Sequence, residues 1–373
     1  MTVKYMGSKR FMLMNGFGEA IVERARSSER VVDLFAGSGA VAWFAAQATG
    51  RPVHAYDLQS YAAVLSLAVI GRTTAISAKN VEATWLAAVR EALQQSPLLS
   101  REPESFTETD VLAARERCAA TEVGSIWSAY GGHYFSPNQA LTLDIALELL
   151  PKREPHRSFC HAAVIAAAAY CAAAPGHTAQ PFQPTDTALR YITESWQRDP
   201  LQRIAVWVND TARRHARVRG KAGVADAVEQ ARRLKPSDLV IVDPPYSAVQ
   251  YSRFYHVLET VARAVPVDVS GVGRYPPRED RPSSRFSLRT QSEPAISELL
   301  DNLAATGCDV LLTFPAGESS NGLSGTEIVR IASRKFDVST KTVLGRFSTM
   351  GGNNAVRASR HPSVELILSL SPR

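Results

Sequence analysis

The residue types that could do chemistry together are most concentrated at positions 238–246, which read Asp-Leu-Val-Ile-Val-Asp-Pro-Pro-Tyr. Leu239–Val242 is a short apolar, β-branched run, which predicts a buried strand of a parallel sheet. Two prolines then end the strand and hold the backbone extended, because a proline nitrogen cannot donate to a neighbouring strand. The run therefore places the Asp243 carboxylate, the Pro244 carbonyl and the Tyr246 ring at the carboxyl end of a strand, where open α/β sheets bind ligands.

This set of groups suits a reaction of an exocyclic amine such as N6 of adenine. The lone pair of that nitrogen is delocalised into the ring, so the amine attacks poorly. If Asp243 and the Pro244 carbonyl each accept one amino hydrogen, the nitrogen becomes pyramidal and its lone pair is directed at an electrophile. Tyr246 offers a face on which a base pulled out of a duplex can stack, an interaction worth about 1–3 kcal/mol. The tetrapeptide alone is also compatible with a turn that only ends a strand.

A second group of residues predicts a cofactor that contains adenosine. Val31–Phe35 reads as a buried strand, Gly37 and Gly39 allow a tight turn, and a helix over Ala40–Ala48 presents its N-terminus above that turn. A second strand, Val53–Asp57, ends in an acid 18 residues after the last glycine, the place for a carboxylate that binds a ribose diol. No Lys-Ser or Lys-Thr follows the glycines, as it would in a phosphate-binding loop. The cofactor contacts predicted here are Asp33, Phe35, Gly37, Gly39 and Asp57.

Two further groups could reach the same cofactor. The N-terminal segment Lys4–Arg10 combines an aromatic ring, a Gly-Ser turn and cations, so that Lys9 could bind a cofactor carboxylate with Tyr5 packed nearby. An ordinary basic N-terminus is the alternative. Asp226 precedes a short helix expected over Val228–Leu234, just ahead of the central strand. Its carboxylate could accept a hydrogen bond from the adenine amino group of the cofactor.

The alternation of strands and helices predicts an α/β fold. Later strands are expected at Cys308–Phe314, Phe336–Leu344 and Val364–Leu370. Between residues 72 and 202 the alternation stops, and the pattern there predicts helices over Val81–Gln95, Asp110–Ala119, Asn138–Leu149 and Arg157–Ala174. We therefore expect a doubly wound, Rossmann-like sheet domain formed by residues 1–71 and 203–373, with a mostly helical inserted lobe at 72–202.

Basic and amide side chains predict a nucleic-acid partner. The chain has 42 Lys and Arg against 36 Asp and Glu, a net charge of +6, which is a moderate excess. A polar loop of the inserted lobe carries candidate readers of base edges. Residues 267–292 have the composition of a mobile arginine-rich loop that could close over an everted base or clasp the DNA backbone. Plain surface loops are the alternative in both places. The predicted DNA contacts are His177, Gln180, Gln250, Arg253, Arg274 and Arg285.

Other features of the chain favour a cytoplasmic protein. The four cysteines show no Cys-x-x-Cys pair and lie in apolar surroundings, which is typical of buried free thiols in a reducing compartment. No metal is expected. The first residues lack a signal-peptide pattern, and the longest apolar stretch, Ala162–Ala174, is too short to cross a bilayer. Five cations between residues 213 and 221 form either a phosphate contact or a solvated helix face.

Taken in this order, the motifs resemble those of Dam-type adenine-specific DNA methyltransferases, most closely the modification enzymes of type IIS restriction systems. Three stretches carry the likeness, Lys4-Tyr-Met-Gly-Ser-Lys9, Asp33-Leu-Phe-Ala-Gly-Ser-Gly39 and Asp243-Pro-Pro-Tyr246, and Gln250–Glu259 adds to it. The resemblance covers nearly the whole catalytic core. It implies a Rossmann-like methyltransferase sheet, S-adenosylmethionine as methyl donor, double-stranded DNA as substrate and base flipping. It also implies cofactor contacts at Tyr5, Lys9, Asp57 and Asp243, and a target adenine at Asp243–Tyr246.

The expected function is thus methylation of adenine N6 in DNA by a monomer that serves a restriction-modification or related defence system, beside a cognate endonuclease or defence proteins. Two alternatives remain. A methyltransferase acting on RNA or protein is one, because related strand ends there read Asn-Pro-Pro-Tyr. The N-terminal element and the large lobe disfavour it. A catalytically silent DNA-binding partner is the other, and the intact Asp243, Gly37 and Gly39 disfavour it. The inserted lobe matches too loosely to imply a recognised sequence.

Overall fold

The computed structural model describes residues 9–348 and 360–373, and these residues form two compact units. The helical unit consists of Ala75–Arg213 and Ser252–Arg281. The sheet unit contains the remaining described residues, which are residues 9–74, Arg214–Tyr251, and residues 282–348 and 360–373.

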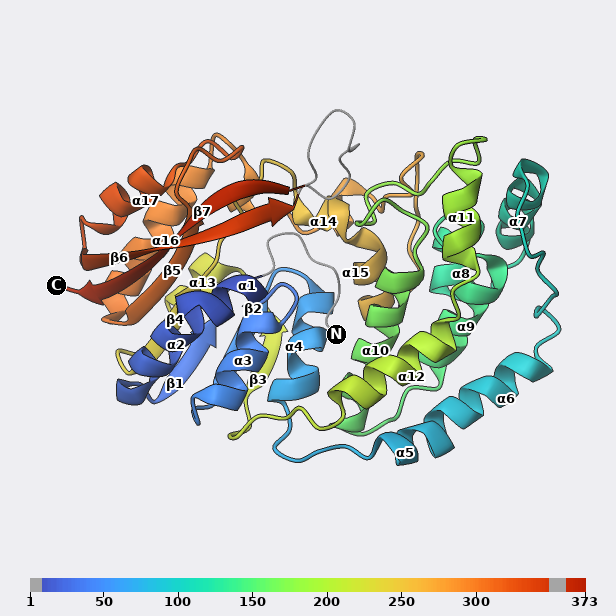
Figure 1. Ribbon diagram of the computed structural model, residues 1–373, viewed down its shortest axis with the longest axis horizontal. Coiled ribbons are helices and arrows are strands. Elements are labelled where there is room, and N and C mark those ends of the chain that lie inside the picture. The colour runs from blue at the N-terminus through green and yellow to red at the C-terminus, as the bar shows by residue number, and fades with distance from the viewer. Residues whose placement is uncertain (1–8, 349–359) are drawn as a thin grey trace. The chain divides into compact units, whose positions relative to one another are not determined.

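The described strands of the sheet unit form a single seven-stranded sheet in the order β3-β2-β1-β4-β5-β7-β6 (Figure 1). The five strands from β3 to β5 run parallel, whereas β7 is antiparallel to both of its neighbours. The strands are β1 (Arg30–Asp33), β2 (Val53–Asp57), β3 (Lys221–Val224), β4 (Asp238–Val242), β5 (Asp309–Pro315), β6 (Phe336–Ser348) and β7 (Arg360–Pro372). This mixed α/β arrangement confirms the predicted Rossmann-like methyltransferase fold.

Both faces of the sheet are covered by helices, because its strands are apolar on both sides. Val32 and Val240 belong to the core formed with α13, α16 and α17. Val31 and Leu239, one position earlier on the same strands, point to the opposite face and are fully buried. There α2 contacts α3 and α3 contacts α4 (Figure 1). The bounds of these helices are α2 (Gly18–Arg24), α3 (Ala40–Ala48), α4 (Ser60–Ile70), α13 (Ala227–Ala231), α16 (Ser292–Thr306) and α17 (Gly325–Ala332).

The helical unit is organised around α10 (His156–Cys171), a 16-residue helix of which 12 residues are buried. This helix contacts α9, α12 and α15. The helices predicted in the inserted lobe are confirmed with shifts of a few residues at their ends. The other helices that lie in this unit or border it are α5 (Ala78–Val81), α6 (Ala87–Gln95), α7 (Glu108–Ala120), α8 (Ser125–Tyr130), α9 (Pro137–Glu148), α11 (Leu189–Trp196), α12 (Pro200–Thr211), α14 (Tyr251–Phe254) and α15 (His256–Arg263).

Short helical turns complete the chain. A π-helical turn, Glu82–Leu86, joins α5 to α6, so that Ala78–Gln95 is helical throughout. The remaining turns are α1 (Arg10–Met12), the π-helical turn Leu13–Phe17, and the 3-10 turns Ala25–Ser27, Arg278–Asp280 and Arg285–Ser287. The predicted arginine-rich loop at 267–292 is thus largely irregular backbone broken by two short turns and by a bridge between Ser270 and Tyr275.

The two units divide the chain at points that differ from the expected boundaries of 72 and 202. Residues 203–213 lie in the helical unit because they continue α12, which packs on α10 through the buried Ile204, Trp207 and Val208. Residues 252–281 also lie there, since α15 packs on α8 and α10. The amphipathic face of α15, including Val257 and Val261, is buried. Helix packing therefore assigns these segments to the lobe, although they flank the central strand in sequence.

The strand β3 was not predicted. It contains only four residues, lies at the edge of the sheet and leaves Val224 58 % exposed, so no apolar run marks it. The basic segment expected to be a phosphate contact or a helix face leads into this strand at Lys221.

All four cysteines are buried and unpaired, as predicted. Within the ranges 9–348 and 360–373, no helix combines the length and the apolar content needed to cross a membrane.

Candidate active site

The central strand β4 delivers Asp243 to the carboxyl edge of the sheet. All five residues of β4 are buried and the strand stops at Val242, so the predicted strand and its end at the two prolines are confirmed. The Asp243 side chain, in contrast, is 18 % exposed. Because β4 lies between β1 and β5, this carboxylate is flanked by the ends of two parallel strands.

One oxygen of the Asp243 carboxylate carries two polar contacts. The Lys9 ammonium lies 3.0 Å from Asp243 Oδ1 and also 3.0 Å from Glu365 Oε2. The Thr313 hydroxyl donates to the same Oδ1 at 2.8 Å. Lys9 is only 3 % exposed and Thr313 is fully buried. The predicted cofactor ligand Lys9 is therefore held between two carboxylates of the sheet unit, whereas the predicted ligand Tyr5 lies outside the described residues.

The charges of this cluster set the protonation of its members. Burial alone would lower the pKa of Lys9, but the carboxylate of Asp243 and, further, Tyr246 and Glu365 raise it instead. Burial raises the pKa of Asp243 and the charge of Glu365 adds to this, while the Lys9 ammonium and the Thr313 hydroxyl lower it. Lys9 is thus a permanent cation, and Asp243 is a carboxylate whose proton affinity depends on its neighbours.

Asp33 is the most deeply buried acid of the site, at 1 % exposure. Its Oδ1 accepts a hydrogen bond from the Phe35 amide at 3.1 Å. Its Oδ2 is buried with no hydrogen-bond partner among residues 9–348 and 360–373. Burial raises the pKa of Asp33 to about 7, and the nearby charges of Asp243 and Asp57 contribute to the rise. An orphaned buried oxygen of this kind leaves a polar position for a ligand group.

The glycine turn after β1 and the acid that ends β2 lie against each other. Gly37 and Gly39 have φ values of 49° and 76°, a region that favours glycine. The Gly37 amide donates to Asp57 Oδ2 at 2.8 Å. A Cβ at Gly39 would lie 3.1 Å from Trp43 Nε1 and 3.3 Å from Ser66 Oγ. The predicted residues of the turn and Asp57 are therefore brought together at one edge of the sheet, close to Asp33.

Aromatic and amide side chains hold the Pro-Pro-Tyr segment in place. Tyr246 is 7 % exposed, packs edge-on against Phe314 at 6.4 Å, and has the Lys9 ammonium 5.2 Å from its ring centroid. The amide of Asn321 donates to the carbonyls of Pro245 at 3.1 Å and Phe286 at 3.0 Å. Asn321 therefore ties the turn after β4 to the chain near Phe286.

Phe286 is also the neighbour of Phe35, a predicted cofactor contact. The two rings pack edge to face, with centroids 5.1 Å apart and planes at 90°. Phe35 is only partly buried. The contact with Phe286 therefore orients the Phe35 ring at the end of β1 and leaves part of that ring accessible.

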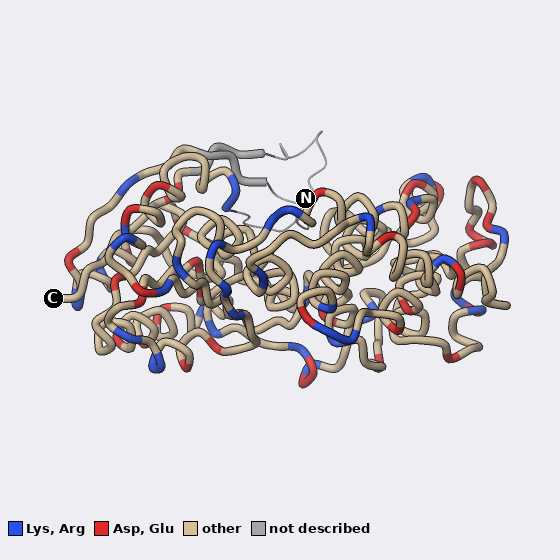
Figure 2. The backbone as a smooth tube through the Cα atoms, turned by 90° about the horizontal axis from the view of Figure 1, so that it is seen from below, with Lys and Arg blue, Asp and Glu red and all other residues tan. Residues whose placement is uncertain are grey.

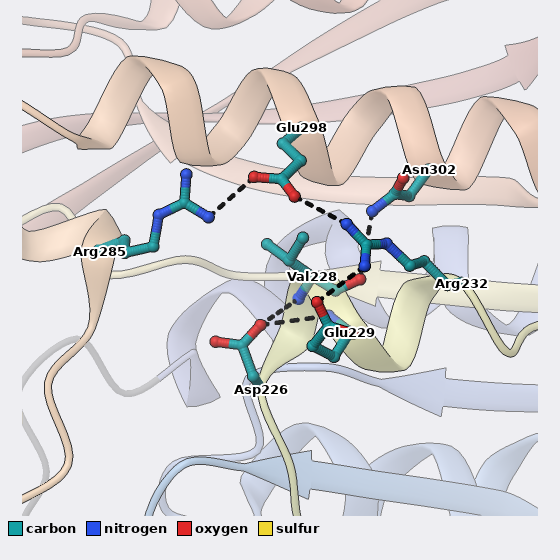
Figure 3. A network of polar contacts seen from close by, with 7 residues as sticks. All are labelled: Asp226, Val228, Glu229, Arg232, Arg285, Glu298 and Asn302. Atoms are coloured by element: carbon teal, nitrogen blue, oxygen red, sulfur yellow. Dashed lines mark hydrogen bonds and ion pairs between the residues drawn. The ribbon is translucent and has the colours of Figure 1, made fainter.

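Asp226 begins α13 as its N-cap (Figure 3). One oxygen, Oδ1, accepts from the amides of Val228 at 2.9 Å and Glu229 at 3.2 Å. The second oxygen is directed away from the helix (Figure 3). The cap explains why an acid stands here locally, and the second oxygen is the group that the predicted cofactor contact requires.

Two predicted DNA contacts lie in a polar loop of the helical unit. His177 is partly buried, its ring centroid lies 4.5 Å from that of Phe254, and its Nδ1 accepts from the Ala179 amide at 3.2 Å. Nε2 therefore carries the proton of the neutral ring, and burial lowers the pKa of His177. Gln180 is exposed. Both are chemically able to contact a polar ligand from this loop.

His177 also borders a cavity of about 390 Å³ inside the helical unit. Aromatic rings and small apolar side chains make up much of its wall, with two guanidinium groups at Tyr170. The larger side chains that line it include Tyr170, Phe182, Tyr191, Tyr255, Arg198 and Arg203.

The predicted DNA contacts Arg253 and Arg274 differ in exposure and in their hydrogen-bond partners. Arg253 is exposed, and its Nε donates to the Tyr275 hydroxyl at 3.1 Å. Arg274 is partly buried and donates to the backbone carbonyls of Ala129 at 2.8 Å and Ser128 at 3.1 Å. The guanidinium of Arg274 thus fastens its own loop to the end of α8.

The two remaining predicted contacts lie in the sheet unit. The Gln250 amide is paired with the backbone of Ser284, donating at 2.9 Å and accepting at 2.7 Å. Arg285 forms an exposed ion pair with Glu298 at 2.8 Å (Figure 3). Lys and Arg positions and Asp and Glu positions are scattered over both units (Figure 2).

Three residues of the cluster were not predicted from the sequence. Thr313 is a hydroxyl residue near the end of an otherwise apolar strand, and Glu365 is an acid in the last strand. Each is a polar residue in an apolar run, which is only a weak indication of a functional role. Asn321 lies in a polar loop and gives no such indication. Their contacts depend on which strands are neighbours, which no local pattern shows.

Comparison with known families adds an independent observation. A family model described as D12 class N6 adenine-specific DNA methyltransferase matches residues 5–266. This range contains Lys9, Asp33, Asp57 and Asp243, whereas Thr313 and the last strands lie beyond it. No curated protein sequence matches the chain.

Proposed function

Because the chain belongs to the D12 class of N6 adenine-specific DNA methyltransferases, we propose that it transfers the methyl group of S-adenosylmethionine to an adenine flipped out of double-stranded DNA. The observation that carries the proposal is the gathering of Asp33, Asp57 and Asp243 at one edge of the sheet, beside the glycine turn. A cofactor site and an amine-accepting carboxylate are then adjacent, as methyl transfer requires.

The residues at the glycine turn fit an adenosine-containing methyl donor. The Asp57 carboxylate ends β2, where a ribose diol is bound in folds of this type. The orphaned Oδ2 of Asp33 leaves a polar position for a ligand group, and the glycine turn fits closely against Trp43 and Ser66 at Gly39. We propose cofactor contacts at Tyr5, Lys9, Asp33, Phe35, Gly37, Gly39, Asp57, Asp226 and Asp243. When bound, the donor supplies a methyl group on a positively charged sulfur.

The Asp243 turn supplies the groups that activate the amine. Asp243 and the Pro244 carbonyl each accept one hydrogen of adenine N6, which aims the nitrogen lone pair at the methyl carbon. After transfer the nitrogen is cationic and acidic, so it loses one proton to the Asp243 carboxylate or to water. The Tyr246 ring stacks on the extruded base. The raised pKa of Asp243 makes this carboxylate a better proton acceptor than an exposed one.

The wider setting follows from the substrate. We propose that the enzyme is a monomer that acts on cytoplasmic, nucleoid-associated DNA in a restriction-modification or related defence system, beside a cognate endonuclease, like the type IIS enzymes its motifs resemble. The proposed DNA contacts are His177, Gln180, Gln250, Arg253, Arg274 and Arg285. Single-molecule sequencing of DNA from cells expressing the chain would identify the methylated site and strand.

Replacement of the amine acceptor tests the proposal. Asp243→Ala should lower transfer of tritiated methyl groups to duplex DNA by at least about a hundredfold, while calorimetry still detects cofactor binding. Asp337→Ala, at an exposed acid of β6 paired with Arg373, is the control and should leave transfer unchanged. Near-normal transfer by Asp243→Ala would refute the assignment. Preferred methylation of RNA by the wild type, or absence of cofactor binding, would favour the two alternative functions in turn.

A further inference from the structure

We propose that Thr313 and Glu365 are positioning residues, which fix the Asp243 carboxylate so that its Oδ2, and not its Oδ1, faces the target amine. This inference rests on the proposed function and adds to it two residues outside the matched family range. Neither residue needs to touch the substrate, since each acts through Asp243 or through Lys9.

The hydrogen bonds of Asp243 are distributed unequally between its oxygens. The Thr313 hydroxyl at 2.8 Å and the Lys9 ammonium at 3.0 Å both contact Oδ1. Among the described residues, the hydrogen bond and the ion-pair contact of Asp243 both go to Oδ1, and no hydrogen bond goes to Oδ2. A carboxylate oxygen offers about two lone-pair sites, so Oδ1 is filled by these two donors. The open acceptor of the partly exposed side chain is therefore Oδ2.

The sheet register explains why Thr313 reaches Asp243. Val242 of β4 pairs with Leu312 of β5 in a parallel ladder, so the next residues, Asp243 and Thr313, emerge side by side. Thr313 is fully buried, and its β-branched side chain has few rotamers. The hydroxyl is thus a rigid donor that limits rotation of the carboxylate.

Glu365 keeps the Lys9 ammonium on the Oδ1 side. Lys9 has a long, flexible stem and could otherwise shift toward Oδ2, where it would compete with the amine. Glu365 Oε2 lies 3.0 Å from the same ammonium. It comes from β7, where it pairs with Pro315, two residues beyond Thr313 on β5. Two neighbouring strands therefore hold the two donors that define the orientation of Asp243.

The cluster also predicts how each residue tunes the proton affinity of Asp243. The charged or titratable groups that act on Asp243 are Lys9 before α1, Glu365 on β7, Asp33 on β1 and Tyr246 after the turn. The Thr313 hydrogen bond lowers the pKa of Asp243, and the Glu365 charge raises it. Loss of the first and loss of the second should therefore shift that pKa in opposite directions.

The experiment measures methyl transfer to duplex DNA as a function of pH. Thr313→Val removes the hydroxyl at nearly constant shape, and we expect kcat to fall about ten- to a hundredfold with KM for DNA and S-adenosylmethionine little changed. In the plot of kcat against pH, the acid limb of Thr313→Val should move to higher pH, because the pKa of Asp243 rises when the Thr313 hydrogen bond is lost. Thr313→Ser keeps the hydroxyl and should restore most of kcat. Thr340→Val, at an exposed threonine of β6, is the matched control.

Glu365→Gln provides the second arm. It removes a negative charge but keeps an amide that can contact Lys9, and we expect its acid limb to move to lower pH. General loss of stability cannot produce opposite shifts in the two variants. The inference is overturned if Thr313→Val has wild-type kcat and pH profile, if Thr313→Ser behaves like Thr313→Val, or if both limbs move the same way. A wild type that binds cofactor without methylating DNA would instead overturn the proposed function, and this inference with it.

Discussion

The Lys9 ammonium lies 3.0 Å from Glu365 Oε2, so the beginning of the described chain is bound to its last strand by a buried ion pair. The same ammonium contacts Asp243 at 3.0 Å. Lys9 is 3 % exposed, and the two carboxylates are 18 % and 17 % exposed. One cation thus compensates two partly buried anions, and its removal leaves both without a partner of opposite charge among the described side chains.

We therefore expect Lys9→Met to lower the free energy of unfolding by about 3–5 kcal/mol at neutral pH, the usual cost of breaking a buried pair on one side. Without the ammonium, the folded-state pKa of Asp243, which burial already raises, rises further above its unfolded value. Folding then binds protons, so the variant loses stability as pH increases and is closer to wild type at pH 5 than at pH 8. Urea unfolding at both pH values measures this. Lys341→Met, at an exposed lysine 3.8 Å from Glu19, should cost less than about 1 kcal/mol.

The second prediction concerns Asp33, whose pKa is about 7 against 3.8 for the free side chain. The folded protein binds a proton here that the unfolded chain releases, so this group makes stability fall as pH rises from about 4 to 7. The slope reaches at most about 1.4 kcal/mol per pH unit. Asp33→Asn cannot titrate, so its stability relative to wild type should be greater at pH 8 than at pH 5. If the unfolding free energies of the two proteins changed with pH in the same way across this range, the pKa of Asp33 would not be raised in the folded protein.

The third prediction separates backbone strain from steric approach at the glycine turn. Gly39 and Gly50 have similar φ values of 76° and 67°, but a Cβ at Gly50 would meet nothing within 4 Å. Both alanine variants should lose about 1–2 kcal/mol to the left-handed backbone. Gly39→Ala should lose more, because its Cβ would lie 3.1 Å from Trp43, and only this variant should bind S-adenosylmethionine more weakly in calorimetric titrations. Equal cofactor affinity in the two variants would exclude Gly39 from the site.

The sheet could be predicted from the sequence wherever its strands are apolar runs that are buried on both faces. Leu239–Val242 and Cys308–Phe314 predicted β4 and β5 within a few residues. The edge strand β3 was missed, since Gly223 and the exposed Val224 give it no such run. The segment 252–281 was expected with the catalytic sheet, whereas it lies in the helical unit, because its position depends on the packing of α15 against α10.

The site could be predicted only where a local motif marks it. Asp243 follows two signals that lie next to it, a buried strand and two prolines, and Asp57 follows its own strand. Thr313 and Glu365 reach the same cluster through the strand order β4-β5-β7, which neither residue's neighbours in sequence reveal. The burial of Tyr246, at 7 % exposure, likewise comes from Phe314 on another strand.

The last prediction tests Arg285, a proposed phosphate contact that is paired with Glu298 at 2.8 Å. Arg330 offers a matched control, since it is paired with Glu293 at the same distance and is similarly exposed, at 50 % against 43 %. Each phosphate contact contributes about 0.9 to the slope of log K against log salt concentration. Arg285→Ala should therefore reduce the slope for duplex DNA by about 0.9, whereas Arg330→Ala should not change it. Identical slopes for the two variants would mean that the Arg285–Glu298 pair persists when DNA is bound, and that Arg285 is a structural residue of the sheet unit.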